Sequence, residues 1–403
     1  MRAGVGYSEN PDTAAAAVEA ATAALAQAGK TGPPCDLVLL FSTARHDARI
    51  LHDSVVSVVG EFPRIVGGGA VGAMTNDQFG YAGDQVGIAV IWLDGVQCDI
   101  LDEGGLLQGE EKAVGQRLGK KLAALGIGQT SHVVMFYDSF DRTRGDLRLV
   151  QASSLIEGME ESLGFFPALS GAGLMGDFTN SPSWQWTGEK MAERHALALA
   201  FGDGVQVDSV IIHGCRPITG YYTVTKSEQQ TILEINGEPA LTFLDRLLGA
   251  SILPESYPFF LILGINKGDK WVEFNEYNYV NRLCLALDKE RKGLVMFESD
   301  MVEGTEFQIM HRSLNLDYMK PQIEGLFKGL GGRRPVFAFY IDCAGRAAAY
   351  AGLDQEDAVR VQEIVAGRVP LLGLYTGVEI GSVMGRSRAL DWTGVFCLFS
   401  VPQ

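Results

Sequence analysis

The chain has too little positive charge for one large class of functions. Its 403 residues hold 33 lysines and arginines against 49 aspartates and glutamates, so the formal net charge is -16. Proteins that bind nucleic acid or anionic membranes neutralise phosphates with a surplus of lysine and arginine. The composition therefore predicts no nucleic-acid partner and no membrane partner, and it suits a neutral or zwitterionic small molecule.

Paired cysteines and long apolar runs are also missing. The cysteines form no CxxC pair and most lie inside apolar runs, which is typical of reduced thiols in a cytosolic protein. The first residues, MRAGVGYSENPDT, lack the apolar core of a signal peptide, and no run reaches the ~18 apolar residues that span a bilayer. We therefore expect a cytoplasmic protein. The six cysteines are Cys35, Cys98, Cys215, Cys284, Cys343 and Cys397.

The absence of paired histidines removes the usual signature of a metal enzyme. The six histidines contain no HxxxH or HxH spacing, whereas a metal site wants two or three ligands on one element. We predict no metal site and no bound cofactor. A haem needs only one axial histidine, so haem stays open as an alternative cofactor. Ser139 and Ser170 end strands but lie outside G-x-S-x-G, so a serine hydrolase is not indicated.

What the sequence does contain is a recurring pattern of strands and helices. The tetrapeptide DGVQ occurs at Asp94 and again at Asp203, within two similar series of elements, which indicates an internal duplication. A helix between two strands predicts a crossover between parallel strands. Residues 331–403 resemble a third, divergent copy. The predicted elements of the first two copies include helices at 13–27, 48–60, 110–125 and 149–163 and strands at 3–7, 36–41 and 132–137.

The glycine loop from Gly67 to Gly72 follows a predicted strand. It has G-x-G spacing, but no Walker lysine and no acidic residue at the end of a later strand. A tight backbone crossover is favoured over contact with a ligand, and we reject nucleotide binding.

The length of the chain and a change in its pattern of predicted elements indicate two domains. A chain of 403 residues exceeds the size at which one hydrophobic core keeps growing. After the duplicated part, turns at 266–269 and 292–293 indicate a β-meander. We predict an N-terminal domain, residues 1–215, with an internal α/β duplication, and a C-terminal domain, residues 216–403. The predicted fold class is α/β, with two domains of mixed sheets and crossover helices.

Several segments occur in a characteristic order along nearly the whole chain. They are GGGAVGAMTND, HGCRPITGYYTVTK, EINGEPALTFLDRLLG, VNRLCLALDKERKGLVMFESDMVEGTEF, FYIDCAGR, PLLGLYTGVEIG and WTGVFCL. This ordered set resembles the FIST family of sensory proteins, with its N-terminal and C-terminal FIST domains. The resemblance implies a sensor of small molecules such as amino acids, and some members resemble haem-containing nitric-oxide sensors. Because no kinase, methyl-accepting or cyclic-di-nucleotide module follows residue 403, we expect a separate signalling partner to carry the output.

Polar side chains follow the last two predicted crossover strands. In an α/β sheet, neighbouring strand ends present such groups together, and ligand sites are expected there. An arginine can hold a carboxylate through two parallel hydrogen bonds, and a carboxylate can hold an amino group, so both signs together suit a zwitterion. The predicted ligand-binding residues are Arg282, Asp342, Cys343, Arg346, Tyr375, Thr376 and Glu379.

Within this set, Arg282 and Arg346 are assigned to the ligand's carboxylate, and Asp342 and Glu379 to its amino group. A purely structural ion pair between Arg346 and Glu379 is an equal alternative. Tyr375 is assigned to the wall of the pocket, although a tyrosine on a strand also suits the core.

Cys343 supports a different hypothesis. An arginine three residues later would lower the pKa of the thiol and make it a nucleophile, although a buried structural cysteine is favoured. Our main expectation is a stand-alone sensor of an amino-acid-like ligand that is not an enzyme. The alternatives are a haem-binding nitric-oxide sensor and a cysteine-dependent enzyme.

Overall fold

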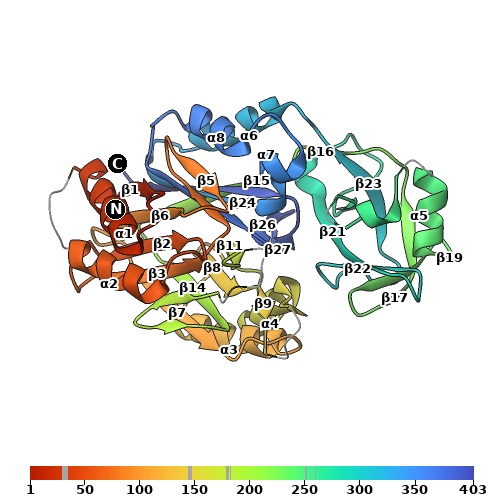
Figure 1. Ribbon diagram of the computed structural model, residues 1–403, viewed down its shortest axis with the longest axis horizontal. Coiled ribbons are helices and arrows are strands. Elements are labelled where there is room, and N and C mark those ends of the chain that lie inside the picture. The colour runs from red at the N-terminus through yellow and green to blue at the C-terminus, as the bar shows by residue number, and fades with distance from the viewer. Residues whose placement is uncertain (30–34, 144–147, 178–180, 182, 250–251, 259) are drawn as a thin grey trace.

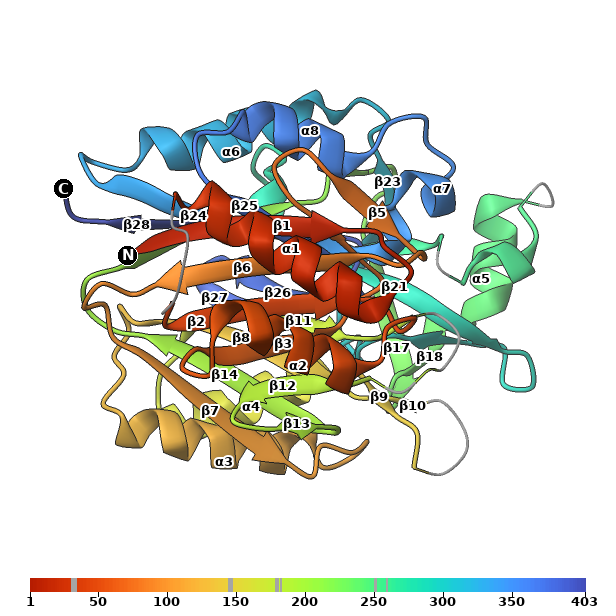
Figure 2. The same ribbon diagram turned by 60° about the vertical axis from the view of Figure 1, so that its left-hand side comes forward.

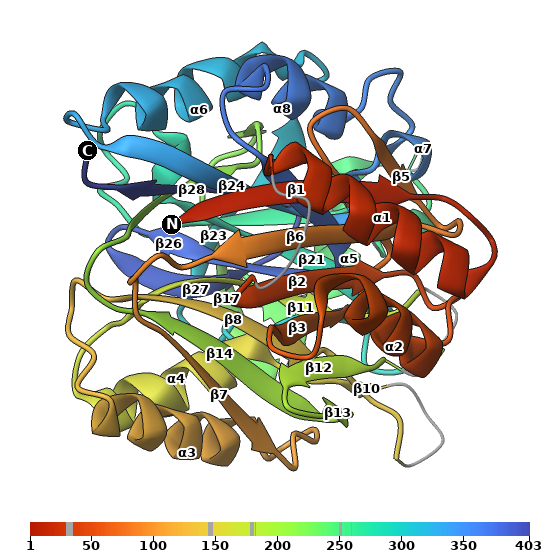
Figure 3. The ribbon, with the colours of Figure 1, turned by 90° about the vertical axis from the view of Figure 1, so that its left-hand side faces the viewer.

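The computed structural model describes residues 1–29, 35–143, 148–177, 181, 183–249, 252–258 and 260–403. Its first unit is a sheet with the strand order β1-β6-β2-β3, covered on its outer face by two helices (Figures 2 and 3). Strands β2 and β3 are parallel and joined by α2, while β6 is antiparallel to β1 and β2. The unit comprises β1 (Arg2–Ser8), α1 (Thr13–Gln27), β2 (Leu37–Ser42), α2 (Ala48–Val59), β3 (Arg64–Gly69) and β6 (Val86–Trp92).

Local sequence explains why these helices begin and lie where they do. The Asp12 carboxylate accepts the N–H of Ala15 at the start of α1, and Asp47 caps α2 in the same way. Helix α1 lies directly against β1. A Cβ atom at Gly6 would be 2.0 Å from the Ala20 carbonyl oxygen, so the glycine permits this close packing.

The second unit repeats this pattern with the order β7-β14-β8-β11, and the third repeats it again with β15-β28-β24-β25. In each unit the last two strands are parallel and joined through a helix. The second comprises β7 (Cys98–Gly104), α3 (Glu111–Ala124), β8 (His132–Asp138), α4 (Ala152–Leu163), β11 (Ala168–Leu174) and β14 (His195–Phe201). The third comprises β15 (Gln206–Ile212), α6 (Met319–Lys328), β24 (Arg334–Cys343), α8 (Asp357–Val365), β25 (Leu371–Thr376) and β28 (Gly394–Val401).

The three units exchange short strands in a cycle. After its parallel pair, each unit extends a hairpin arm that adds to the edge of another unit. The arm of the first unit pairs with β25, that of the second with β3, and that of the third with β11. The arms are β4 (Gly72–Met74) with β5 (Phe79–Tyr81), β12 (Gln185–Gly188) with β13 (Met191–Ala192), and β26 (Val378–Val383) with β27 (Arg386–Leu390).

The inner faces of the three sheets meet in one core. Phe41 of β2, Phe136 of β8 and Phe339 of β24 lie in mutual contact, with ring centroids 5.2, 5.8 and 6.0 Å apart. The helix pairs α1/α2, α3/α4 and α6/α8 lie around the outside (Figure 3). We call this part of the molecule, residues 1–212 and 313–403, the α/β ring. The predicted α/β class, with crossover helices and an internal duplication, is confirmed, and the expected third copy completes the repeat.

Residues 213–312 form a separate β lobe on one side of the ring (Figure 1). Its strands pair in the order β23-β17-β18-β22-β21-β20, and β20 pairs back to β23, so the sheet closes. The lobe comprises β16 (Cys215–Pro217), β17 (Tyr222–Glu228), β18 (Thr231–Ile235), β19 (Glu238–Pro239), α5 (Ala240–Leu248), β20 (Ile262–Asn266), β21 (Tyr279–Asp288), β22 (Gly293–Met296) and β23 (Glu306–Arg312). The predicted C-terminal domain, residues 216–403, therefore covers most of the lobe and most of the third unit.

The remaining short elements lie in the connections. They are β9 (Phe140–Asp141), β10 (Arg148–Leu149), α7 (Ala348–Ala351) and the 3-10 turns η1 (Pro254–Ser256), η2 (Glu276–Asn278), η3 (Leu316–Tyr318) and η4 (Ala344–Arg346). Across the residues that the structure describes, no helix is both long enough and apolar enough to cross a membrane.

Candidate functional site

A cavity of about 160 Å³ lies where strand ends of the second and third units meet the β lobe. Carboxyl ends of parallel strands are the usual place for a ligand in α/β proteins. The segments after β8, β11, β24 and β25 supply one side, and β21 and the residue after β22 supply the other. The lining residues are Ser139, Phe140, Arg142, Leu149, Met175, Asp177, Leu283, Leu285, Phe297, Cys343, Ala344, Gly345, Thr376, Gly377, Val378 and Trp392.

Most of this lining is apolar, and its hydroxyl groups are already engaged within the chain. The Ser139 hydroxyl donates to the Leu174 carbonyl at 2.7 Å. The Thr376 hydroxyl donates to the Gly173 carbonyl. Both bonds connect the ends of β8 and β25 to the end of β11. The two hydroxyl groups therefore have a structural role, and towards a ligand they can act only as hydrogen-bond acceptors.

Cys343 lies in the wall of the cavity and is only 4% exposed. Burial raises the pKa of its thiol well above the usual range, and the nearby Glu379 carboxyl raises it further. The lowering expected from Arg346 does not prevail, because burial dominates and the guanidinium is paired with two aspartates. Cys343 therefore remains a protonated thiol at neutral pH, which does not suit a nucleophile.

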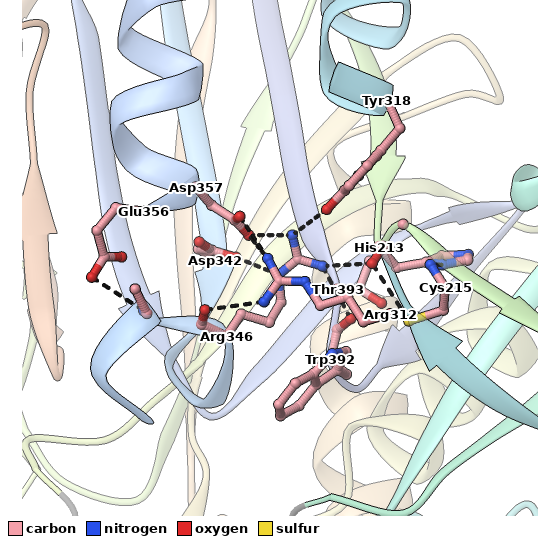
Figure 4. Close-up of polar contacts among 12 residues, drawn as sticks. His213, Cys215, Arg312, Tyr318, Asp342, Arg346, Glu356, Asp357, Trp392 and Thr393 are labelled. Carbon is pink, nitrogen blue, oxygen red and sulfur yellow. Dashed lines mark hydrogen bonds and ion pairs between the residues drawn. The ribbon is translucent and has the colours of Figure 1, made fainter. Parts of the chain in front are cut away.

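Arg346 occupies the centre of a buried polar network beside the cavity (Figure 4). Its Nε donates to Asp342 at 3.0 Å, and Nη2 donates to Asp357 and reaches the Tyr318 hydroxyl at 3.5 Å. Its Nη1 donates to the carbonyls of His213 at 3.1 Å and Trp392 at 3.3 Å. The three nitrogens thus use their donors within the chain, and no donor is left over for a ligand carboxylate.

Arg312 of β23 completes this network from the side of the β lobe. It makes two hydrogen bonds of 2.6 Å to Asp357 and a third of 3.2 Å to the Arg346 carbonyl. Two arginines thus oppose two aspartates, Asp342 and Asp357, with all four side chains buried. The network joins the lobe to the third unit.

The other predicted residues lie around the cavity at different depths. Glu379 is fully buried and accepts the Thr393 N–H at 3.3 Å. Burial, with the neighbouring Asp391 and Asp342, raises its pKa well above the ordinary value. Tyr375 is buried against the ring of Tyr81, at 5.2 Å between centroids. The ion pair between Arg346 and Glu379 that was the alternative to ligand binding is not formed.

Arg282 faces a second hollow instead. Its Nε and Nη2 donate to the two oxygens of Asp300 at 2.6 and 2.7 Å, and Nη1 donates to the Ala389 carbonyl at 3.0 Å. Of the seven predicted residues, the structure thus places Cys343 and Thr376 in the cavity wall. Asp342, Arg346, Tyr375 and Glu379 lie behind that wall.

Besides Ser139, three lining residues that sequence reasoning did not select carry polar groups. Arg142 follows β8, and its guanidinium lies 3.6 Å from Asp138 and over the Phe140 ring. Asp177 follows β11 and accepts the Ser181 hydroxyl at 2.6 Å. The buried Trp392 Nε1 has no acceptor among the described residues. Superimposing the predicted copies would have pointed to Arg142 and Asp177, because they follow the strands equivalent to β24 and β25.

The cavity does not suit a haem. None of its described lining residues is a histidine. The buried His213 has its ring nitrogens engaged, one with the Cys215 N–H at 2.9 Å and one with the Glu276 carbonyl at 3.1 Å. A cavity of about 160 Å³ is also far smaller than a porphyrin.

Comparison with known proteins assigns the family. A model of the FIST N domain matches residues 36–238, and a model of the FIST C domain matches residues 240–382. The chain belongs to the FIST family. The resemblance inferred from its sequence is confirmed, and FIST domains are sensor domains of signal transduction. In this FIST protein the cavity lies between the two matched regions, since the lining residues from 139 to 177 fall in the first and those from 283 to 378 in the second, with Trp392 beyond both.

The similar proteins name no activity that can be transferred. Uncharacterized proteins from Mycobacterium bovis and Mycobacterium tuberculosis are 26% identical to the FIST chain over 200 residues, covering 49% of it and 51% of each relative. The match thus spans about half the length of these curated relatives. A crystal structure of cyanuric acid hydrolase from A. caulinodans aligns over 100% of this chain and 99% of its own, with 9% identity and a TM-score of 0.33. A likeness this weak carries no argument.

Proposed function

We propose that this FIST protein is a sensor of a small zwitterion with an apolar side chain, such as an apolar amino acid, and that it signals through a separate partner in the cytoplasm. The observation that carries the proposal is an apolar cavity, between the α/β ring and the β lobe, that also contains a guanidinium and a carboxylate. Membership of a sensor family supports a binding role rather than an enzymatic one.

Size and lining favour an apolar group of a few carbon atoms. The cavity measures about 160 Å³, and an apolar cavity of about 150 Å³ in another protein stays dry and binds benzene. Phe140, Met175, Leu283 and Phe297 contribute apolar surface from four different segments of the chain. A leucine-sized or phenylalanine-sized side chain would fill such a space.

Polar groups of the same cavity match the two ends of a zwitterion. The Arg142 guanidinium can bind a carboxylate through paired hydrogen bonds, and the Asp177 carboxylate can accept hydrogen bonds from an ammonium group. The Trp392 Nε1–H supplies a further donor that has no acceptor among the described residues. We assign to Arg142 and Asp177 the roles that the sequence alone had suggested for Arg346 and Glu379.

The position of the cavity suggests how binding would become a signal. Leu283, Leu285 and Phe297 belong to the β lobe, whereas Cys343, Thr376 and the other lining residues belong to the ring. A ligand that contacts both the lobe and the ring favours the arrangement in which the lobe is closed against the ring around the ligand. Binding then shifts the population of lobe positions, which a partner protein can read.

A thermal-shift screen tests the proposal. Leucine, phenylalanine and methionine should raise the unfolding midpoint, because a ligand at about 100 times its dissociation constant adds about 2.7 kcal/mol. Glutamate, lysine and the uncharged analogue isobutylbenzene should not. Leu285→Phe, which fills part of the cavity, should abolish the shift, and Leu314→Phe at a 69% exposed site is the matched control. Equal shifts in both variants, or none with any apolar amino acid, would refute the proposal.

A further inference from the structure

A second hollow, of about 290 Å³, lies between the β lobe and the α/β ring. Helix α4 and strand β27 form its ring side, and the residue after β20, Arg282 of β21 and the segment after β22 form its lobe side. It shares no described lining residue with the apolar cavity. Its lining residues are Ser153, Ser154, Ile156, Glu157, Lys267, Arg282, Ser299, Asp300, Arg386, Ser387, Arg388 and Ala389.

Four cations face this hollow, and two of them have partners in the chain. Arg282 is bound to both oxygens of Asp300, at 2.6 and 2.7 Å. Arg386 is bound to both oxygens of Glu160, at 2.9 and 2.5 Å. The charges of these two arginines are therefore neutralised by carboxylates of the chain.

The other two cations, Lys267 and Arg388, have no side-chain hydrogen bond and no ion pair among the residues that the structure describes. The Nε of Arg388 is buried without an acceptor. The acidic side chains that face the hollow are committed elsewhere, Asp300 to Arg282 and Glu157 to Lys112 at 3.2 Å. Two positive charges thus remain uncompensated in a chain whose net charge is -16.

The surroundings of both unpaired cations disfavour their charged forms. Burial lowers the pKa of Lys267, and the charges of Arg388, Arg282 and Arg386 lower it further against the opposing effect of Asp300. Burial also lowers the pKa of Arg388, with Arg386 as the next cause. A protein gains nothing in stability from gathering like charges in a partly buried place, so an anion from outside is the natural counter-charge.

We propose that this hollow binds the phosphate group of a small molecule, held between Lys267 and Arg388. Arginine binds phosphate oxygens in pairs and lysine binds them as a point charge, so the two together suit a dianion. The hydroxyls of Ser153, Ser154 and Ser299 line the same hollow and can donate to further oxygens. The first N–H groups of α4 are not available, because Glu298 accepts those of Ala152 and Ser153 at 3.1 Å.

The two cations belong to different parts of the molecule. Lys267 directly follows β20 in the β lobe, and Arg388 lies on β27 of the ring. A phosphate held by both would join the lobe to the ring beside the apolar cavity. Phosphate binding would therefore favour the same position of the lobe against the ring as the proposed zwitterion, but from a separate site. The two proposals are independent, because an experiment that refutes one site leaves the other site untested by that result.

Isothermal titration calorimetry with inorganic phosphate and glycerol phosphate tests this site, against chloride at matched ionic strength. We expect Lys267→Gln and Arg388→Gln each to weaken binding about tenfold or more, because each removes a charge-assisted contact. Lys328→Gln, which removes an exposed charge at the end of α6, should change the affinity less than about twofold. Equal affinity in all variants, or no preference for phosphate over chloride, would overturn the proposal.

Two further measurements separate this role from its alternatives. Without phosphate, the unfolding midpoint of Lys267→Gln and Arg388→Gln should equal or exceed that of the wild type, because a repulsion is removed. A marked loss of stability would instead assign both residues a structural role. Sedimentation with phosphatidylcholine vesicles should be the same with and without phosphatidic acid, and dependence on phosphatidic acid would place the phosphate on a lipid and refute a small-molecule ligand.

Discussion

Arg346 illustrates what a single residue reveals only in three dimensions. A cation after a predicted strand end suggests a ligand contact, and its neighbour Asp342 suggests one as well. The structure satisfies both through Asp357, which begins α8, and through Arg312 on β23. No local sequence pattern predicts Asp357 and Arg312 as partners, because they lie on elements separate from the one that carries Arg346. Cys343 and Thr376, in contrast, reach the cavity wall directly from the ends of β24 and β25.

The network gives a first prediction. Arg346→Met should lower the free energy of unfolding by about 3–5 kcal/mol, because it leaves the buried Asp342 without its cation, while Asp357 keeps only Arg312. Arg360→Met should cost less than about 1 kcal/mol, since its partner Asp317 is 73% exposed. Urea denaturation followed by circular dichroism measures both. A stable Arg346→Met protein that no longer binds its ligand would show instead that Arg346 contacts the ligand directly.

A second prediction concerns pH. Burial raises the pKa of Glu298 to about 7, above its value of 4.5 in an unfolded chain, although Arg282 opposes the shift. Between these values the folded protein holds the extra proton, so the contribution of Glu298 to the free energy of unfolding falls as pH rises through this window. From pH 5 to pH 8, wild type should lose on the order of 1–3 kcal/mol more than Glu298→Gln.

Urea unfolding at both pH values measures this difference. Glu363→Gln, at a 58% exposed position on α8, is the control and should follow the wild-type profile. Parallel profiles for wild type and Glu298→Gln would mean that the carboxyl is already ionised in the folded protein.

At the scale of elements, much of the fold is predictable from sequence, and its strand exchange is not. The predicted helix from Thr13 to Gln27 agrees with α1 at both ends, because Asp12 caps it and Gly29 follows it. Crossover strands were also predictable from their apolar runs and intervening helices. The arms escaped prediction because β4 and β12 are only three and four residues long and pair with strands far away in the sequence. Short strands carry little pattern, and topology decides their partners.

Gly171 on β11 provides the prediction at this scale. It lies between β8 and the incoming arm strand β26, opposite Met135 and Ile380. A Cβ atom there would be 1.9 Å from the Met135 carbonyl oxygen, so Gly171→Ala must push two strands apart at a cost of about 1–3 kcal/mol or more. Gly128→Ala, where a Cβ atom meets nothing within 4 Å, should be neutral. Thermal unfolding distinguishes the two, and equal midpoints would contradict this packing.

For the whole molecule, the exchange of arms has a consequence for residues 1–215, the predicted N-terminal domain, when they are expressed alone. In that fragment β11 lacks β26, β15 lacks β28, and β4 lacks β25. Unpaired edges of buried apolar strands favour aggregation. We therefore expect residues 1–215 expressed alone to be unfolded or insoluble by size-exclusion chromatography. Co-expression with residues 216–403 should restore a soluble complex. A monodisperse, folded 1–215 fragment would instead establish it as an autonomous domain.

The cyclic pairing of the three α/β units also bears on how the protein responds to heat. Each unit receives an arm strand from one neighbour and adds its own arm strand to the other. No unit can therefore unfold while the other two keep complete sheets. The units should share a single endothermic peak in calorimetry, whereas the described strands of the β lobe pair only with one another. We therefore expect the motion proposed for sensing to occur at the junction of the lobe and the ring, with the ring as its fixed reference.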